Sequence, residues 1–518
     1  MCRFFNIAGP CNKVQHYIID PATRLHGVED LIEYGQYFVI HAARQSGKTT
    51  YLQDLAQRLH AKGKYYALYC SLENLQGVID PKEGIPAIVR QIKNVLRFSD
   101  IPKKEEFAKD ADWEDFTGLL QTELTHFSIE LDKPLVILFD EADCLSEGTL
   151  ITFLRQLRNG YNNRSTTPFV HSVALVGMRN IRDFKARVRP DSETLGSASP
   201  FNIVTRALTI RNFNHEEIVE LYAQHTAETG QVFEPEAIET VWRQTQGQPW
   251  LVNAIAYEVI YDMLQSDFSK PVTADLVEKA IQTIILRRDV HIDSLLERLK
   301  EPRVRRVIEP MMMGEFVSTS SDDFQYTRDL GLIRVTKEAI EPANPIYAEV
   351  IVRTLNSDMQ QSLQRSDFAY KMPRYLKNGK IDMTALMQDF QQFWRENSAI
   401  WDERFLYKEA APHLILMAFL QRVVNGGGQI IREMAAEKGR LDICVIYEGQ
   451  KYPIELKIWR GEKSFSDGLT QTARYMDTFG VNEGWLALFD RRPDRSWDEK
   501  VYMQKENVNG KTITVVGL

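Results

Sequence analysis

The stretch that decides the fold is Tyr37-Phe-Val-Ile-His-Ala42-Ala-Arg-Gln-Ser-Gly47-Lys48-Thr49. Its first five residues form an apolar run typical of a buried strand, and a helical pattern begins after the threonine. Between them lies a loop that ends in Gly-Lys-Thr, the sequence of a phosphate-binding loop (P-loop) in the strand-to-helix context that such a loop needs. Backbone N–H groups bind phosphate there, the lysine reaches the β- and γ-phosphates, and the threonine hydroxyl ligates Mg²⁺. The first motif position, usually Gly, is Ala42.

A second segment completes the predicted nucleotide site. The apolar run 135–139 is followed by Asp140 and Glu141, which is the pattern of a Walker B strand. Asp140 is predicted to hold Mg²⁺ through water, and Glu141 to polarise the attacking water. We therefore expect ATP and Mg²⁺ as cofactors. The predicted nucleotide-binding residues are Arg44, Gln45, Ser46, Gly47, Lys48, Thr49, Thr50 and Asp140.

Around these motifs, short apolar strands alternate with helical stretches from residue 37 to about residue 211, which predicts a parallel α/β sheet. The expected strands span residues 37–41, 65–70, 135–139, 170–176 and 205–210. A helical pattern follows and is broken at Gly247-Gln248-Pro249. Beyond residue 290, the sequence predicts short helices, then a wing at 330–335 and 339–342, and then a polar helical stretch.

Residues 1–290 resemble the AAA/STAND-type ATPases, a P-loop class close to the archaeal-type ATPases. The matching elements are the loop at 43–49, the Asp140-Glu141-Ala142-Asp143 box, the strand end at 175–180 and the break at 247–251. The resemblance implies that Arg179 or Asn180 senses the γ-phosphate, that residues 291–356 form a winged helix, and that the protein is a homo-oligomer. The arginine finger stays open among Arg155, Arg158, Arg164 and Arg206, each of which also fits a surface charge.

A different chemical pattern lies near the C-terminus. Asp442 stands at the start of one apolar strand, and Glu455 and Lys457 stand two positions apart on a second strand, after a turn at 448–450. Residues two apart on a strand point to the same face, so the three side chains would converge. Two carboxylates hold Mg²⁺ through oxygen ligands, and a lysine positions water or steadies developing charge. This combination predicts metal-dependent cleavage of a phosphodiester.

The order helix, three strands, helix, strand over residues 401–518 resembles the PD-(D/E)xK nuclease superfamily, in particular its domains fused to ATPases in bacteria and archaea. Leu441 stands where the family name has Pro. The likeness implies Mg²⁺, or alternatively Mn²⁺, at this site. It implies catalytic roles for Asp442, Glu455, Lys457 and Gln471, an accessory role for Tyr475, and metal ligation by Asp442, Glu455 and Glu409. The alternative is a hairpin with a surface Glu–Lys pair and an exposed helix acid at 409.

Composition narrows the functional classes. A chain of 518 residues predicts several domains. The net charge of −8 argues against binding nucleic acid by overall basicity, so any contact with DNA or RNA needs a local patch. No apolar run reaches the length of a membrane span. Five cysteines without metal or redox spacing predict a reduced, cytoplasmic protein.

The predicted fold is α/β multidomain: a P-loop NTPase parallel sheet (1–212), a helical lid (213–290), a winged helix (291–356), a helical linker (357–400) and an αβββαβ restriction-endonuclease-like domain (401–518). The predicted function is an ATP-controlled nuclease that cuts DNA more readily than RNA. A role in phage or plasmid defence or in mobile-element biology is implied by the resemblance alone. Two alternatives stay open: a regulatory or signalling ATPase whose nuclease-like domain only binds nucleic acid, and an ATP-driven DNA translocase or remodeller.

Overall fold

The computed structural model describes residues 3–178, 204–287, 290–312, 317–336, 340–351, 375–377, 380–404, 416, 419–420, 428–432, 443–459, 461–490, 492 and 495–518. These residues form two compact units. The first comprises residues 1–297, 319–334 and 342–346, and the second comprises residues 298–318, 335–341 and 347–518. No helix in the described part of the chain has the length and apolarity to cross a bilayer.

The first unit is built on a five-stranded sheet in the order β2-β3-β4-β1-β5, with every neighbouring pair parallel. Its strands are β1 (Tyr37–His41), β2 (Tyr66–Ser71), β3 (Leu135–Asp140), β4 (Ser172–Gly177) and β5 (Val204–Thr209). The predicted parallel sheet is confirmed. The bounds of β1 agree with the prediction, and the ends of the other four strands differ from it by at most two residues. Hydrogen bonding to neighbouring strands, which the sequence does not reveal, sets where a strand ends.

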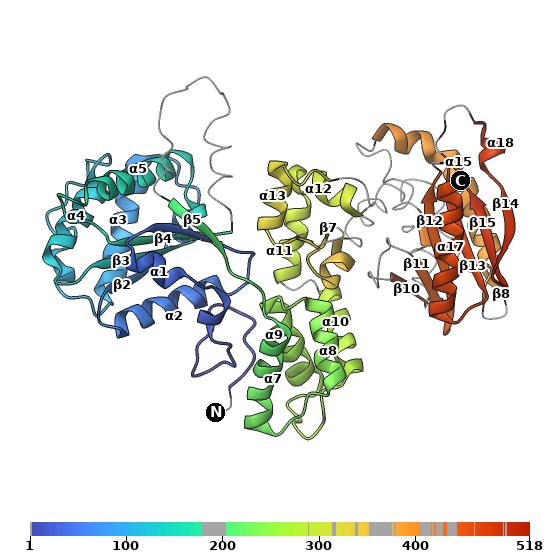
Figure 1. Ribbon diagram of the computed structural model, residues 1–518, viewed down its shortest axis with the longest axis horizontal. Helices are drawn as coiled ribbons and strands as arrows, with labels where there is room; N and C mark the ends of the chain where they lie inside the picture. The colour runs from blue at the N-terminus through green and yellow to red at the C-terminus, as the bar shows by residue number, and fades with distance from the viewer. Residues whose placement is uncertain are drawn as a thin grey trace. The chain divides into compact units, whose positions relative to one another are not determined.

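Helices cover both faces of this sheet (Figure 1). Tyr37 and Val39 of β1 pack with one set of helices, and Phe38 and Ile40 pack with the other. Burial on both sides explains why these strands read as continuous apolar runs. One face holds α1 (Val28–Glu33) and α2 (Lys48–Ala61), and the other holds α3 (Pro81–Arg97), α4 (Leu119–Glu130) and α5 (Glu147–Asn163). Short 3-10 turns are η1 (Pro21–Arg24), η2 (Glu73–Leu75), η3 (Lys104–Glu106) and η4 (Ala142–Cys144).

A helical segment follows the sheet, as the sequence predicts. It contains α7 (His215–Thr229), α8 (Pro235–Thr245), α9 (Pro249–Tyr257), a π-helical stretch (Glu258–Met263) and α10 (Ala274–Arg287). The break at Gly247 separates α8 from α9. Gly247 has φ +71°, and a Cβ atom there would lie 1.9 Å from the carbonyl oxygen of Phe213, so the close approach of these two backbones requires glycine.

Three helices and two short strands come next. They are α11 (Val290–Leu299), α12 (Pro302–Met312), α13 (Asp322–Asp329), β6 (Ile333–Val335) and β7 (Ile340–Pro342). This order agrees with the one expected of a winged helix, and the assignment stays a prediction.

The second unit contains a six-stranded mixed sheet in the order β10-β11-β12-β13-β15-β14. The strands are β10 (Gly428–Arg432), β11 (Ile443–Tyr447), β12 (Gln450–Ile458), β13 (Glu483–Phe489), β14 (Met503–Val508) and β15 (Lys511–Gly517). Besides α12, the second unit also contains β8 (Leu376–Lys377), β9 (Lys380–Ile381), α15 (Met383–Arg404), α17 (Glu462–Phe479) and α18 (Trp497–Lys500). Strands β12, β13 and β15 are parallel, and the outer pairs are antiparallel.

Helix α17 packs on this sheet through a cluster that includes Met476, Leu486 and Leu488. Phe489 points to the other face by strand alternation, and Phe390 of α15 contacts its ring at a centroid distance of 6.4 Å. Gln391 of α15 donates hydrogen bonds to the carbonyl oxygens of residues 502 and 517, at 2.9 and 2.7 Å. The linker predicted over 357–400 was expected to be helical, and α15 is a helix from residue 383. Its residues Phe390, Gln391 and Trp394 pack against the C-terminal sheet.

Candidate functional site

The P-loop connects β1 to α2, and its lysine side chain folds back to bond the backbone at the start of the loop. Lys48 is buried, and its Nζ donates hydrogen bonds to the carbonyl oxygens of Ala42 and Ala43, both at 3.0 Å. Gly47 caps α2 at φ +88°, a left-handed conformation that favours glycine. Burial lowers the pKa of Lys48, while the charges of Glu141 and Asp140 act in the opposite direction. An incoming phosphate would replace these two carbonyl partners with a charged one.

The Walker B aspartate meets the P-loop threonine across the sheet. Thr49 Oγ1 donates to Asp140 Oδ2 at 2.7 Å, and the Tyr69 hydroxyl donates to the same oxygen at 3.1 Å. The backbone N–H of Glu141 donates to Asp140 Oδ1 at 3.0 Å. Strand β4 separates β1 from β3, so the sheet order rather than sequence proximity brings Thr49 to Asp140. A hydroxyl beside a carboxylate fits the oxygen ligands that Mg²⁺ uses in P-loop sites.

Glu141 has an unusual backbone at the end of β3. Its φ of +53° lies in the left-handed region, which costs energy for a residue with a side chain and often marks a functional position. Burial raises the pKa of the Glu141 carboxyl, and Lys48 opposes that shift. A raised pKa makes a carboxylate a stronger base, which is the direction that the predicted role of Glu141 requires.

Asp143, the fourth residue of the box, has a positioning role that its sequence alone does not reveal. Its Oδ2 accepts a hydrogen bond from the backbone N–H of Met178 at 3.1 Å. A Cβ atom at Gly177 would lie 2.4 Å from Asp143 Oδ1, so this approach requires glycine. Asp143 thus ties the Walker B turn to the end of β4. The predicted sensors, Arg179 and Asn180, lie outside the described residues.

Neighbouring elements of the first unit hold the other predicted P-loop residues. Gln45 Oε1 pairs with His291 Nδ1, and the Gln45 carbonyl oxygen accepts from Gln248 Nε2 at 3.5 Å. Arg44 Nη1 donates to Ser294 Oγ at 3.0 Å. The remaining two hydroxyls differ: Thr50 Oγ1 accepts from the backbone N–H of residue 11 at 3.0 Å, and Ser46 Oγ is buried without a hydrogen bond to any described residue. The loop is therefore restrained by α11 and by the start of α9.

The arginine-finger candidates remain unassigned, but the structure gives Arg164 a different use. Its guanidinium donates to the carbonyl oxygens of Gly35 and His171, the second at 3.3 Å. These two residues precede β1 and β4, so Arg164 lies at the N-terminal ends of the strands, whereas the P-loop follows the C-terminal end of β1. Arg155 and Arg206 are exposed, and Arg158 is half-buried.

His41, the last residue of β1, gives the first unit a pH dependence. Burial, together with the charges of Arg328 and Lys48, lowers the pKa of His41 from 6.5 to about 4. The folded protein keeps this imidazole neutral whereas the unfolded chain protonates it, so its contribution to stability is complete above pH 6.5 and is lost as the pH falls toward 4. We expect the first unit to lose about 2 kcal/mol of unfolding free energy from this group between about pH 7.5 and about pH 5.

Urea unfolding of the first unit at both pH values measures this loss, and His41→Asn is the matched variant because it keeps a polar group near Thr209, whose hydroxyl lies 3.1 Å from His41 Nε2. The variant should show a smaller pH dependence than the wild type. An unchanged dependence would show that other groups cause it.

In the second unit, Glu455 and Lys457 form a buried ion pair on β12. Lys457 Nζ lies 2.7 Å from Glu455 Oε1, and the two side chains are only 10% and 2% exposed. Glu455 and Lys457 lie on one face of β12 as predicted, and they are buried rather than placed at the surface. The predicted convergence with Asp442 stays a prediction. Helix α17 lies close over this pair, because a Cβ atom at Gly468 would come within 3.0 Å of Lys457 Cγ. The sequence analysis did not use Gly468, although a glycine inside a helix can indicate that the helix packs closely against a strand.

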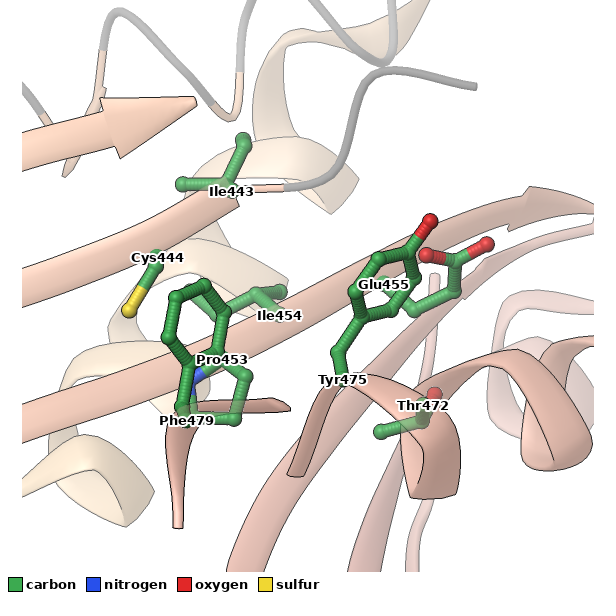
Figure 2. A pocket seen from close by; sticks show the side chains of 8 residues that line it. All are labelled: Ile443, Cys444, Pro453, Ile454, Glu455, Thr472, Tyr475 and Phe479. Carbon is green, nitrogen blue, oxygen red and sulfur yellow. The ribbon is translucent and has the colours of Figure 1, made fainter. Parts of the chain in front are cut away.

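Glu455 lines a small pocket with Thr472 and Tyr475 of α17, and Figure 2 shows the Tyr475 ring beside the Glu455 carboxylate. Gln471, next to Thr472 in sequence, has a buried Oε1 with no hydrogen bond to any described residue. Asp442 and Glu409, the other predicted metal ligands, lie outside the described residues. Within the described part of the chain, no group of three or more His, Cys, Asp or Glu side chains is placed to hold a metal ion. Glu455 is thus the one predicted ligand of this site whose position is known.

Comparisons with known proteins identify the family whose sequence profile this chain matches. The sequence profile of the AAA-like domain matches residues 10–352. No curated protein matches the chain. A solved Walker-type ATPase of Pyrococcus abyssi is 15% identical, with 67% of this chain and 99% of that one covered at a TM-score of 0.47. Cdc6p from Pyrobaculum aerophilum is 14% identical, with coverages of 65% and 96% and a TM-score of 0.35. The RuvB Holliday junction branch migration motor of Thermotoga maritima is also 14% identical, with coverages of 62% and 90% and a TM-score of 0.33.

Proposed function

The chain belongs to the AAA-like domain family, with a P-loop ATPase in its first unit, and from this premise we propose that it is an ATP-controlled, metal-dependent nuclease. The observation that carries the nuclease half is the buried Glu455–Lys457 pair beside the Tyr475 pocket. A charged pair buried this deeply costs desolvation energy and is weak evidence for stability, so a chemical role explains its presence better than a structural one.

The residues of the first unit divide the work of ATP hydrolysis. Lys48 would exchange the carbonyl oxygens of the loop for the β- and γ-phosphates and steady the charge that develops there. Thr49 and Asp140 would hold Mg²⁺, which when bound neutralises phosphate charge. Glu141 would orient and deprotonate the attacking water.

The second unit would carry the cleavage step. Glu455, with Asp442, would hold Mg²⁺ or Mn²⁺, and the metal when bound polarises the scissile phosphate and lowers the pKa of a water molecule. Lys457 would stabilise the added negative charge on the phosphate, because its ammonium is held on the same face of β12. Gln471 and Tyr475 would contact the phosphate or its neighbours from α17, and Glu409 would act as an accessory ligand.

The proposal also includes control, substrate and assembly. ATP binding or hydrolysis would change the contacts that Arg44 and Gln45 make with α11, and so regulate cleavage. DNA is the proposed substrate. The winged helix at 291–356 and a homo-oligomeric state belong to the same proposal.

The experiment that tests this function is cleavage of supercoiled DNA, linear DNA and single-stranded RNA with Mg²⁺ or Mn²⁺, with and without ATP. We expect DNA cleavage that is lost in Asp442→Ala/Lys457→Ala and altered in Lys48→Ala. Cleavage that persists in the double variant would show that the activity comes from elsewhere.

The two alternatives predict different results. A regulatory ATPase would hydrolyse ATP but cut nothing under any condition, and Asp442→Ala would leave its function unchanged. A translocase or remodeller would hydrolyse ATP much faster with DNA present, and Lys457→Ala would not alter that stimulation.

A further inference from the structure

A buried arginine next to the P-loop is not among the nucleotide-binding residues named above. Arg24 ends the 3-10 turn η1 and is 7% exposed. Its Nε and Nη2 donate hydrogen bonds to the carbonyl oxygen of Arg211, at 3.0 and 2.5 Å, and its guanidinium lies over the ring of Phe213 at 4.9 Å from the centroid. Two of its three nitrogens are therefore occupied by one backbone oxygen where the sheet joins the helical lid.

The third nitrogen faces the P-loop. A Cβ atom on Gly47 would lie 3.0 Å from Arg24 Nη1, which puts this donor against the backbone at the N-terminus of α2. The charge of Arg24 also acts on Cys11, whose backbone N–H binds the hydroxyl of Thr50. Arg24 thus lies beside the first turn of α2, where backbone N–H groups and the helix dipole favour an anion.

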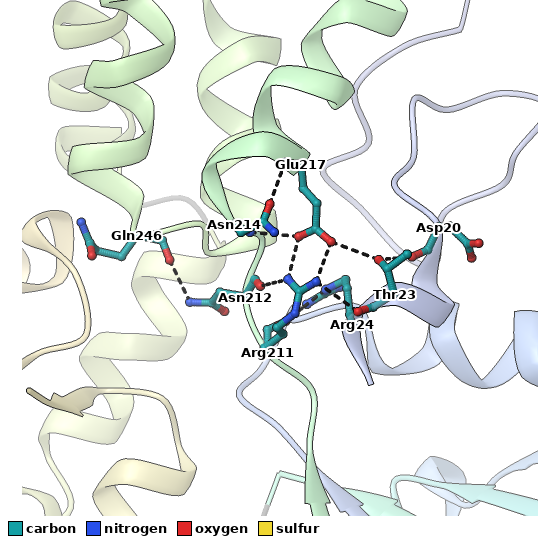
Figure 3. Close-up of polar contacts among 8 residues, drawn as sticks. All are labelled: Asp20, Thr23, Arg24, Arg211, Asn212, Asn214, Glu217 and Gln246. Atoms are coloured by element: carbon teal, nitrogen blue, oxygen red, sulfur yellow. Dashed lines mark hydrogen bonds and ion pairs between the residues drawn. The ribbon is translucent and has the colours of Figure 1, made fainter. Parts of the chain in front are cut away.

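No carboxylate in the described part of the chain is bonded to Arg24, although one is close. Glu217, the nearby acid, accepts hydrogen bonds from Arg211, Thr23 and the backbone N–H of Asn214 (Figure 3). Burial would raise the pKa of Glu217, but these bonds lower it to about 2. The carboxylate therefore stays charged, and its hydrogen bonds are made to these groups rather than to Arg24. Burial lowers the pKa of Arg24 to about 10, which still leaves the guanidinium charged at neutral pH.

We propose that Arg24 is a nucleotide-binding residue, which donates from Nη1 to the phosphate chain of ADP or ATP held by the P-loop. A buried cation lacking a bonded carboxylate, and set against a phosphate-binding helix N-terminus, is completed by an anionic ligand. This inference rests on nucleotide binding by the first unit and not on the proposed nuclease.

The same guanidinium connects the nucleotide to the lid. Its other two nitrogens hold the carbonyl oxygen of Arg211, and the Arg211 side chain binds Glu217 in the first turn of α7 at 2.7 and 2.8 Å. Asn212 extends the connection by donating to the carbonyl oxygen of Gln246, at 3.2 Å, in the turn between α8 and α9 (Figure 3). A phosphate that draws Arg24 toward Gly47 would pull on this junction, so Arg24 would report nucleotide occupancy to the lid.

The test is the Kd of a fluorescent ADP analogue for the full chain and three variants. Arg24→Gln should raise the Kd about 10- to 100-fold, the change expected for loss of one charge-assisted hydrogen bond. Arg24→Lys keeps the positive charge but loses the planar set of N–H donors of the guanidinium. It should therefore raise the Kd by a smaller factor than Arg24→Gln.

Arg3→Gln is the matched control. Arg3 also joins the N-terminal segment to α7, through Glu228 at 2.6 Å and Gln224 at 3.2 Å, but makes no contact with the P-loop. Its Kd should stay within about twofold of the wild type, because a surface ion pair contributes little. If Arg3→Gln raised the Kd as much as Arg24→Gln, Arg24 would only hold the N-terminal segment to the lid, and the proposal would be wrong. A wild-type Kd in both Arg24→Lys and Arg24→Gln would also overturn it.

Thermal unfolding without nucleotide accompanies these measurements. If Arg24→Gln does not fold, Arg24→Lys alone decides, and an unchanged Kd then counts against a phosphate contact. The outcome is independent of DNA cleavage, so a failure here and a failure of the nuclease proposal are distinguishable.

Discussion

Replacing Lys48 by alanine should reduce ATP turnover about 100- to 1000-fold, the loss typical for removing one charged donor aimed at the transition state. The ammonium is buried and already desolvated, and in the folded protein it is held by the carbonyl oxygens of Ala42 and Ala43. Its interaction with a developing phosphate charge is therefore stronger than that of an exposed lysine. Steady-state phosphate release at saturating ATP measures the effect.

Lys62→Ala is the control, because Lys62 lies at the C-terminal end of the same helix, is exposed and pairs with Glu29. This variant should keep wild-type turnover. If Lys48→Ala hydrolysed ATP as fast as Lys62→Ala, the loop at 42–49 would not be the catalytic P-loop.

The second large effect concerns Lys457. Lys457→Ala should destabilise the second unit by about 3–5 kcal/mol, because it removes the ammonium group that pairs with the buried carboxylate of Glu455. Urea or thermal unfolding of the full chain, followed by a probe in the C-terminal sheet, measures this loss. The effect does not depend on whether the site cuts DNA.

The double variant Glu455→Leu/Lys457→Met separates structure from chemistry. Replacing both charges by apolar groups of similar size should restore most of the stability, since a buried ion pair adds little beyond a well-packed apolar pair. Under the proposed function, cleavage stays absent in this stable double variant. A stable double variant that still cuts DNA would show the pair to be structural.

Much of the first unit could be read from the sequence, because its signals are local. The apolar run 37–41 is confirmed as β1 without a change of bounds, and the break at Gly247 separates two helices as expected. The sequence assigned both Thr49 and Asp140 to one predicted Mg²⁺ site, whereas their hydrogen bond depends on the order of β3, β4 and β1 in the sheet. In the second unit, period-2 spacing correctly placed Glu455 and Lys457 on one face of β12.

Two strands at the C-terminus were missed. The sheet was expected to end with β13, but β15 pairs with β13, and β14 forms the far edge. The signal was present as Asn509-Gly510, whose φ values of +51° and +79° fit the two-residue hairpin turn that this dipeptide favours. Strand β14 was harder to see because its polar sequence, Met503–Val508, suits an edge strand exposed to solvent.

The sequence by itself determined the candidate site residues and the strands and helices that hold those of the P-loop, Walker B segment and β12, because these signals span only a few neighbouring residues. Only the tertiary structure decided the partners that come from distant segments. Arg24 reaches Gly47 through the fold of η1, and the carbonyl oxygen of Arg211 holds it there. Asp143 meets Met178 because β3 and β4 are adjacent. These contacts depend on strand order and helix packing, which no local pattern of residues encodes.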